Sequence, residues 1–511
     1  MDKYSRGENS SRLQIPVADK TIVSELSGDF ILPDYQPEIK RLLRVGAVVL
    51  PPSKYISDRD VELAGNVDYY VFYTGSDNAP YCAPLTAEYK INLPIDCDAE
   101  ADGFFNPTGC GAVILPDMIS GRVTAPRKIN IKCRLKSRVQ VAAEMPIEDG
   151  YSHGEDGLQV LRGEVLASEY LRGSGDIWRV SDEMICDSRE GDVRVVSAEG
   201  RTLISEVTVG ENTVSCRGDL YLKLLLCKED DGVPYVTVRK MPISGSVSVD
   251  GANRGDSATA KASVCELNVT VEEGRIGIEA GVLTEVQVAH EQSVGYVKDV
   301  YSVAHKSENE YKTVGVPVDA ICFGGNFTLS DSLPLGETGI APGARIIDTA
   351  GVASVEEYSF EGGKCTLGGK AKFSMLTEKD GEFGVSEIEL PFSYKTPVGS
   401  DVSKAVCECE VISVRAREDG ERVGVDAEIG LSGSAYAVKN EKMLANAVFG
   451  DEIDSRRGEM VVCYPAGDDT LWSVAKRYGA ELNGLRTCNK LSSDVSPDAA
   501  ESLKKVNFLV I

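Results

Sequence analysis

The chain has 511 residues, and its 80 acidic against 54 basic side chains give a net charge of −26. A surface this acidic repels the phosphates of nucleic acids and anionic lipid headgroups, so no nucleic-acid partner is expected. Hydrophobic residues make up 42% of the chain, which excludes disorder along its whole length. The strongest apolar runs, Val45–Leu50 and Leu222–Cys227, are far shorter than the roughly 20 residues of a membrane-spanning helix, so we expect no transmembrane segment.

Residue types that carry catalysis are scarce. The three histidines, His153, His290 and His305, lie far apart, and metal sites and proton relays depend on histidine more than on any other side chain. We therefore expect no enzymatic activity, no catalytic residue, no metal site and no cofactor. The 14 cysteines are dispersed, and a disulfide between the close pair Cys407 and Cys409 would be strained. Reduced core thiols and the lack of an apolar signal segment in the first residues predict a cytosolic location.

Three segments of the chain repeat one another. Each contains an aromatic residue, any residue, an aliphatic residue, Pro or Ser, and then Asp, and the copies lie roughly 150 residues apart. The copies of this motif are Phe30–Asp34, Trp178–Asp182 and Phe327–Asp331. A second anchor of similar period is a glycine that opens a long strand-like run, and its copies are Gly65, Gly218 and Gly369. We expect the three aspartates to cap turns that follow strands, because Asp side chains bond nearby backbone groups.

The last two copies share a third anchor, in which a strand, an acidic turn and a returning strand follow one another. Its turns are Glu273-Gly274 and Asp419-Gly420, and Asp-Gly is a strong hairpin signal. The first copy has Ala125-Pro126 at this place and is therefore the divergent one.

The periodicity within the copies is that of strands. Apolar and polar residues alternate in Lys370–Met375 and Val423–Leu431, which predicts one buried and one exposed face. The continuous run Leu224–Leu226 predicts a strand covered on both faces. Helical periodicity is scarce, and Gln36–Val45 is the best short candidate. The strand order is not predicted by these patterns.

We thus predict a mainly β protein with three tandem β-sandwich-like domains and a small β-α-α-β domain at the C-terminus. The expected parts are an N-terminal segment at residues 1–25, repeat domains at 26–160, 161–310 and 311–455, and the C-terminal domain at 460–511.

The C-terminal segment differs from the repeats in composition and pattern. Its charges balance, and Thr470 or Asp469 is suited to cap a helix whose apolar residues recur at helical spacing until Gly479. A second short helix is expected at Glu481–Cys488. Strand-like segments flank the helix pair, at Val461–Tyr464 and Val506–Ile511.

This segment resembles a LysM domain in Tyr464, Gly467–Trp472, Ala475–Gly479 and the Asn489-x-Leu491 pattern. The resemblance implies binding of N-acetylglucosamine polymers such as peptidoglycan or chitin, in a groove between the loop before the first helix and the loop after the second. The groove residues that it implies are Gly467, Asp468, Asp469, Thr470, Leu471, Asn489 and Leu491. We expect Trp472 to lie in the core rather than to form a sugar platform.

The chain as a whole resembles the SPOCS-domain proteins of endospore-forming Firmicutes. The resemblance lies in the repeats, in the segments Gly28–Val45 and Tyr296–Ser302, and in the LysM-like C-terminal segment. Clostridial spore-coat morphogenetic proteins that bind the coat ATPase scaffold have this architecture. The resemblance implies a non-enzymatic adaptor in the mother-cell cytosol at the forespore surface, with a LysM domain that contacts protein. Two alternatives stay open, a cell-wall protein that binds peptidoglycan through the LysM domain and a wall hydrolase.

Overall fold

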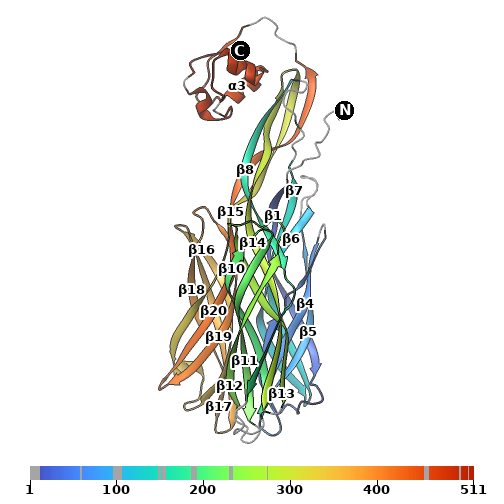
Figure 1. Cartoon of the computed structure of the whole chain (residues 1–511), viewed down its shortest axis with the longest axis vertical. Helices are drawn as coiled ribbons and strands as arrows, with labels where there is room; N and C mark the ends of the chain where they lie inside the picture. Colours follow the sequence, from blue (N-terminus) through green and yellow to red (C-terminus); the bar gives the residue numbers. More distant parts are fainter. Residues whose placement is uncertain are drawn as a thin grey trace.

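The computed structural model describes residues 12–57, 60–95, 106–147, 151, 157–185, 193–228, 234–272, 274–453, 460–493, 496–504 and 506–511. Antiparallel sheets dominate it, and the predicted mainly β class is confirmed (Figure 1). Three elongated β lobes are followed by a small module with short helices. Residues 1–11 of the predicted N-terminal segment, His153, Glu273 and the end of the third predicted domain after residue 453 lie outside the described residues.

Lobe 1 consists of two sheets that enclose one hydrophobic core. The first sheet has the order β1-β7-β6, with β1 at Arg12–Ile31, β7 at Lys128–Pro146 and β6 at Asn106–Ala125. In the second sheet β4 pairs with β5 on one side and with β2 and β3 on the other. These strands are β2 at Arg41–Val49, β3 at Ser53–Ile56, β4 at Asp60–Thr74 and β5 at Pro80–Pro94.

Lobes 2 and 3 repeat this arrangement. In lobe 2 the sheets are β13-β14-β8, with β9 also paired to β14, and β10-β11-β12, whereas in lobe 3 they are β15-β20-β19 and β16-β17-β18. The lobe 2 strands are β8 Leu158–Ser174, β9 Trp178–Ile185, β10 Val193–Val209, β11 Thr213–Lys228, β12 Pro234–Ser248, β13 Ser257–Glu272 and β14 Arg275–Ser302. The lobe 3 elements are β15 His305–Pro334, α2 Leu335–Thr338, β16 Arg345–Glu361, β17 Lys364–Lys379, β18 Glu382–Pro397, β19 Lys404–Asp419 and β20 Arg422–Glu452.

The sequence anchors occupy equivalent places in the three lobes. The aromatic residue of the first anchor lies on β1, β9 or β15, opposite an aliphatic residue of the last strand of its lobe. These pairs are Phe30–Ile129, Trp178–Val282 and Phe327–Ile429. Only Asp34 lies in a turn, and its carboxylate is 3.7 Å from Arg127. Asp182 and Asp331 accept hydrogen bonds from the backbone of the next residue, as expected of these aspartates, but they lie within β9 and β15, because in lobes 2 and 3 the strand that carries the motif continues past it.

The anchor glycines lie within the middle strands β4, β11 and β17 rather than at their start. Close approach of a neighbouring strand explains two of them. A Cβ at Gly218 would lie 2.1 Å from the carbonyl oxygen of Leu203, and one at Gly369 would lie 2.3 Å from that of Ser354. Both carbonyls belong to strands that bulge next to the glycine, so a side chain would force the strands apart.

The predicted helix at Gln36–Val45 is wrong. Residues 36–40 form an irregular loop, and the rest of the segment belongs to β2. Long-range hydrogen bonds hold the loop: Tyr73 donates to the Gln36 side chain, and Arg127 donates to the Gln36 carbonyl. Tertiary partners thus override the weak local helical pattern.

Burial follows the predicted strand pattern. In Lys370–Met375 and Val423–Leu431 the apolar residues are buried, and the polar residues between them lie on the outer face of the sheet. In Leu224–Leu226 all three side chains are buried, so this strand is covered on both faces. Leu224 faces the core of lobe 2, whereas Leu225 faces the neighbouring lobes. The domain ends expected at residues 25, 160 and 310 fall within β1, β8 and β15.

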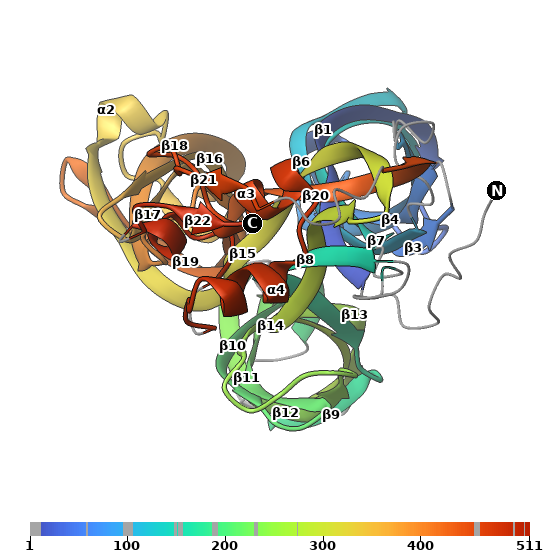
Figure 2. The ribbon, with the colours of Figure 1, turned by 90° about the horizontal axis from the view of Figure 1, so that it is seen from above.

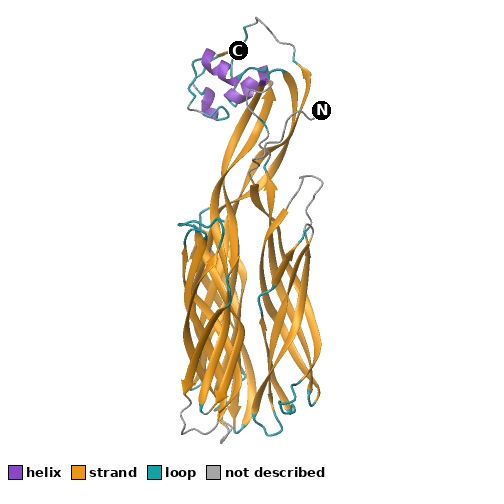
Figure 3. Ribbon diagram, turned by 45° about the vertical axis from the view of Figure 1, so that its right-hand side comes forward, coloured by secondary structure: helices purple, strands orange, loops and turns teal. Residues whose placement is uncertain are grey.

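The three lobes stand side by side around a common axis, as the view from above shows (Figure 2). The first and last strands of each lobe extend beyond it as a two-stranded ribbon, and these ribbons gather into a stem (Figure 3). One hydrophobic cluster joins all three ribbons in the stem. Its members are Leu13, Met145, Ile147, Val165, Ala167, Val294, Tyr296, Val314, Val316 and Met443.

A second cluster joins the lobes themselves. Strands β2, β10 and β16 each contain a β-bulge at an equivalent place. The bulged residues Leu43, Val196 and Ile347 all contact this cluster. The residues that follow the bulges are Arg44, Ser197 and Asp348, which pair with Phe72, Leu225 and Leu376 of the middle strands. These three partners are all buried in the shared cluster.

Beside this cluster, one carboxylate links the three lobes. Asp348 of lobe 3 lies 2.7 Å from Arg44 Nη2 of lobe 1 and 2.9 Å from Lys223 Nζ of lobe 2. Its side chain is 2% exposed. Burial alone would raise the pKa of Asp348, but the charges of Lys223 and Arg44 and their hydrogen bonds lower it to about 2. The carboxylate is therefore ionised at neutral pH and holds two cations from two other lobes.

Replacing this carboxylate should destabilise the assembly of lobes. Asp348→Ala leaves Arg44 without its buried counterion and Lys223 with Glu199 alone, at 3.4 Å, and we expect it to lower the free energy of unfolding by about 3–5 kcal/mol in urea denaturation. The matched control is Asp426→Ala, which removes a surface ion pair with Arg417 and should cost less than about 1 kcal/mol. Equal costs for the two variants would contradict the central role of Asp348.

Candidate functional site

The C-terminal module pairs two short strands around two helices. Its elements are β21 (Val462–Cys463), α3 (Leu471–Tyr478), α4 (Leu482–Cys488), the 3₁₀ helix η2 (Ala500–Leu503) and β22 (Leu509–Val510), with β21 antiparallel to β22. Thr470 caps α3 through a capping box with Ser473, and Gly479 ends the helix in the left-handed conformation. The expected cap and the helix end before Gly479 are confirmed.

Two polar residues of the predicted groove are engaged inside the module. Asp469 accepts a hydrogen bond of 2.9 Å from the backbone of Ala466 and forms an ion pair with Arg477. Asn489 donates to the carbonyls of Leu485 and Val510, at 2.9 and 2.8 Å, and accepts from the backbone N–H of Val510. These side chains fix the loop before α3 and attach the end of α4 to β22.

The remaining groove residues divide into core and surface. Leu471 is buried in the module core, Leu491 packs against the same cluster, and the hydroxyl of Thr470 is engaged in the helix cap. Gly467 and Asp468 are exposed. The structure therefore brings Leu471 and Leu491 together in the core and leaves Gly467 and Asp468 as the exposed surface of the predicted site.

Trp472 is 5% exposed and lies in the module core, but it also reaches beyond the module. Its ring contacts Tyr301 of β14 edge to face, with the centroids 4.9 Å apart. Its indole N–H donates to Asp299 of β14 at 2.8 Å. The module is thus seated on the stem, which Figure 1 shows above the lobes.

Asp299 is the centre of this contact. It accepts hydrogen bonds from Lys476 at 2.6 and 2.8 Å, from Tyr311 at 2.8 Å and from Asn309 at 2.7 Å, in addition to the indole. Burial alone would raise the pKa of Asp299, but these hydrogen bonds and the Lys476 charge lower it below its ordinary value. One ionised carboxylate therefore holds a cation and an indole N–H of the module.

The segment Tyr296–Ser302, part of the sequence resemblance, supplies most of this platform. Lys298 forms an ion pair of 2.8 Å with Asp498 of the module, and the hydroxyl of Tyr301 donates to the carbonyl of Ala480 at 2.7 Å. A β-bulge between Val297 and Asp299 breaks the alternation of the strand, so Lys298 and Asp299 both reach the module. The sequence pattern singled out this segment but not its role.

Removing the Asp299 carboxylate should release the module. In a Trp178→Phe background Trp472 is the remaining tryptophan, and Asp299→Ala should shift its emission to the red as the indole becomes hydrated. Small-angle scattering should show a larger radius of gyration. Asp468→Ala, which changes an exposed carboxylate of the same module, is the control and should leave both signals unchanged.

Acid should have the same effect as the variant. Because the pKa of Asp299 is lower when the module is docked, its contribution is complete above about pH 4 and is lost as the pH falls through the lowered value. The emission maximum of Trp472 should therefore shift with falling pH in the parent protein but not in Asp299→Ala. An emission maximum of the parent protein that does not change with pH would contradict this contact.

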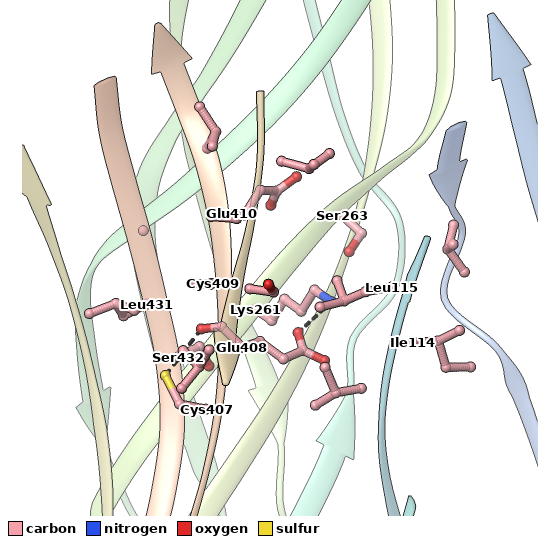
Figure 4. A pocket seen from close by; sticks show the side chains of 18 of the residues that line it. Ile114, Leu115, Lys261, Ser263, Cys407, Glu408, Cys409, Glu410, Leu431 and Ser432 are labelled. Atoms are coloured by element: carbon pink, nitrogen blue, oxygen red, sulfur yellow. Dashed lines mark hydrogen bonds and ion pairs between the residues drawn. The ribbon is translucent and has the colours of Figure 1, made fainter. Parts of the chain in front are cut away.

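A cavity of about 490 Å³ lies on the axis between the lobes. Its walls include segments of β2 and β6, β10 and β13, and β16 and β19, which are edge strands of the six lobe sheets. Lys261 and Glu408 meet across it at 2.5 Å (Figure 4), and Arg201 and Glu410 form a second pair at 2.8 Å. Both pairs connect lobe 2 to lobe 3 by opposite charges.

Cys407 and Cys409 line the same cavity and are free thiols. Burial raises the pKa of Cys409 to about 12 and that of Cys407 well above its ordinary value. Both are therefore protonated at neutral pH, and a protonated thiol is a poor nucleophile and metal ligand.

The chain matches no known protein-family model, and no curated protein matches it. Within the described ranges, no helix is long and apolar enough to cross a membrane. The same part of the chain holds no group of three or more His, Cys, Asp or Glu side chains arranged to hold a metal ion.

Proposed function

We propose that this protein is a non-catalytic adaptor of spore-coat assembly, built from three tandem β-sandwich repeats of the SPOCS type and a C-terminal LysM domain. In this proposal it acts in the mother-cell cytosol at the forespore surface and binds a coat scaffold protein. The repeats form one body, and the module is presented at the end of a stem. The contact of the module with Tyr296–Ser302 carries the proposal, because that segment belongs to the SPOCS resemblance and has a defined structural task here.

The arrangement of the groove supports a protein partner rather than a sugar. Glycan recognition needs polar side chains and backbone groups that converge on the ligand. Here Asp469 and Asn489 use their polar atoms within the module, and Leu471 N–H donates to Ser502. The outer face of β21 and its surroundings instead expose apolar side chains suited to contact protein. They are Met460, Val462, Tyr464 and Phe508.

The localisation of a fluorescent fusion in sporulating cells tests this function. We expect a shell around the forespore on the mother-cell side, and we expect loss of that shell when residues 460–511 are deleted. The Asp426→Ala variant, which changes an exposed carboxylate of lobe 3, is the control and should localise like the parent protein. A signal at the septum or periphery of growing cells would overturn the proposal.

The alternative is a cell-wall protein that binds peptidoglycan through the LysM domain, and the exposure of Gly467 and Asp468 favours it. Cosedimentation with purified sacculi tests it. If the adaptor proposal holds, the protein should stay in the supernatant. If glycan binding occurs in the predicted groove, Asp468→Lys should reduce it, whereas Asp182→Lys on lobe 2 should not. Asn489 is a poor probe, because its replacement would detach α4 from β22.

A further inference from the structure

A second cavity, of about 870 Å³, adjoins the first and is lined by residues of all three lobes. Most of its charged side chains have a partner of opposite sign. Lys54 pairs with Glu285 at 2.9 Å, Lys261 with Glu408 at 2.5 Å, and Arg138 with Asp19 at 2.9 Å. Its volume is within the range of small-molecule sites, about 300–1,000 Å³.

Arg172 of β8 is the exception among these cations. No described residue accepts a hydrogen bond from Nε or Nη1 of its guanidinium, and both atoms are shielded from solvent. The centroid of the Tyr170 ring lies 5.9 Å from Cζ of the guanidinium. A guanidinium carries five N–H donors in a planar fork, and leaving them unpaired in a shielded place is costly.

Two glycines of lobe 1 make room for this guanidinium. A Cβ at Gly109 would lie 2.7 Å from Nη1 of Arg172, and one at Gly111 would lie 3.4 Å from Nη2. Both glycines belong to β6 and flank Cys110, so the arginine of lobe 2 lies across the backbone of lobe 1. A side chain at position 109 would displace the fork.

Burial penalises the charged guanidinium and lowers the pKa of Arg172, although Cys110, Tyr170, Cys322 and Glu285 act in the opposite direction. An oxyanion would relieve this penalty, since the guanidinium fork matches a carboxylate with two parallel hydrogen bonds. Five carboxylates also line the cavity, those of Glu144, Glu169, Asp250, Glu285 and Glu408. Their charges disfavour a doubly charged ligand such as phosphate.

We infer that the cavity binds a small organic molecule through one carboxylate group, which Arg172 holds in a two-point contact at the junction of lobes 1 and 2. The ligand body occupies the cavity between the three lobes. This site is independent of the function proposed for the C-terminal module.

Isothermal titration calorimetry on the full chain tests the site, with sodium benzoate as the probe and inorganic phosphate at matched ionic strength as the comparison. We expect saturable binding of benzoate, about tenfold or more weaker in Arg172→Gln, since a hydrogen bond to a charged group contributes about 1.5–3 kcal/mol. Arg179→Gln removes an exposed arginine of the same lobe and should bind like the parent protein.

A second variant covers the case in which Arg172→Gln does not fold. Gly109→Ala places a methyl group against the movable end of Arg172 and should weaken benzoate binding, whereas Gly295→Ala, which meets nothing within 4 Å, should not. Three results would overturn the inference: no saturable binding of benzoate, equal affinity in the parent and in either site variant, or preference for phosphate.

Discussion

The architecture depends on the burial of sheet edges at the axis between the lobes. An unpaired edge strand offers a row of N–H and C=O groups to any passing strand, and proteins must cover or disrupt it. In each lobe one edge of both sheets faces the axis and lines the cavity that the three lobes enclose there. The bulges at Leu43, Val196 and Ile347 accompany this packing, since they bring an aliphatic side chain to the shared cluster at the same place in each lobe.

Much of the fold could be predicted from the sequence because its signals are local. Alternation of apolar and polar residues predicts strands, and the repeated anchors mark equivalent strands in the three lobes. The cap at Thr470 and the stop at Gly479 depend on residues within one or two helical turns. Gln36–Val45 was misread because the partners of its loop, Tyr73 and Arg127, are distant in the chain.

The candidate sites could be predicted only in part, for the same reason. The groove residues of the module were found from a motif, but a motif does not show that the polar atoms of Asp469 and Asn489 are occupied. Arg172, Asp299 and Asp348 were not predicted, because the groups that surround each of them belong to another lobe or to the C-terminal module. The one available signal was the conspicuous segment Tyr296–Ser302, which contains Asp299. No local signal marks Asp348 or Arg172.

The equivalent positions after the three bulges hold an arginine, a serine and an aspartate. A homotrimer of identical subunits would place three like charges around its axis at this position, and their repulsion would oppose assembly. The ion cluster of Arg44, Asp348 and Lys223 therefore requires copies of different sequence, which divergence of the repeats within this chain supplies. Because each lobe contributes a different side chain to this cluster, the charges specify which lobe occupies which place around the axis.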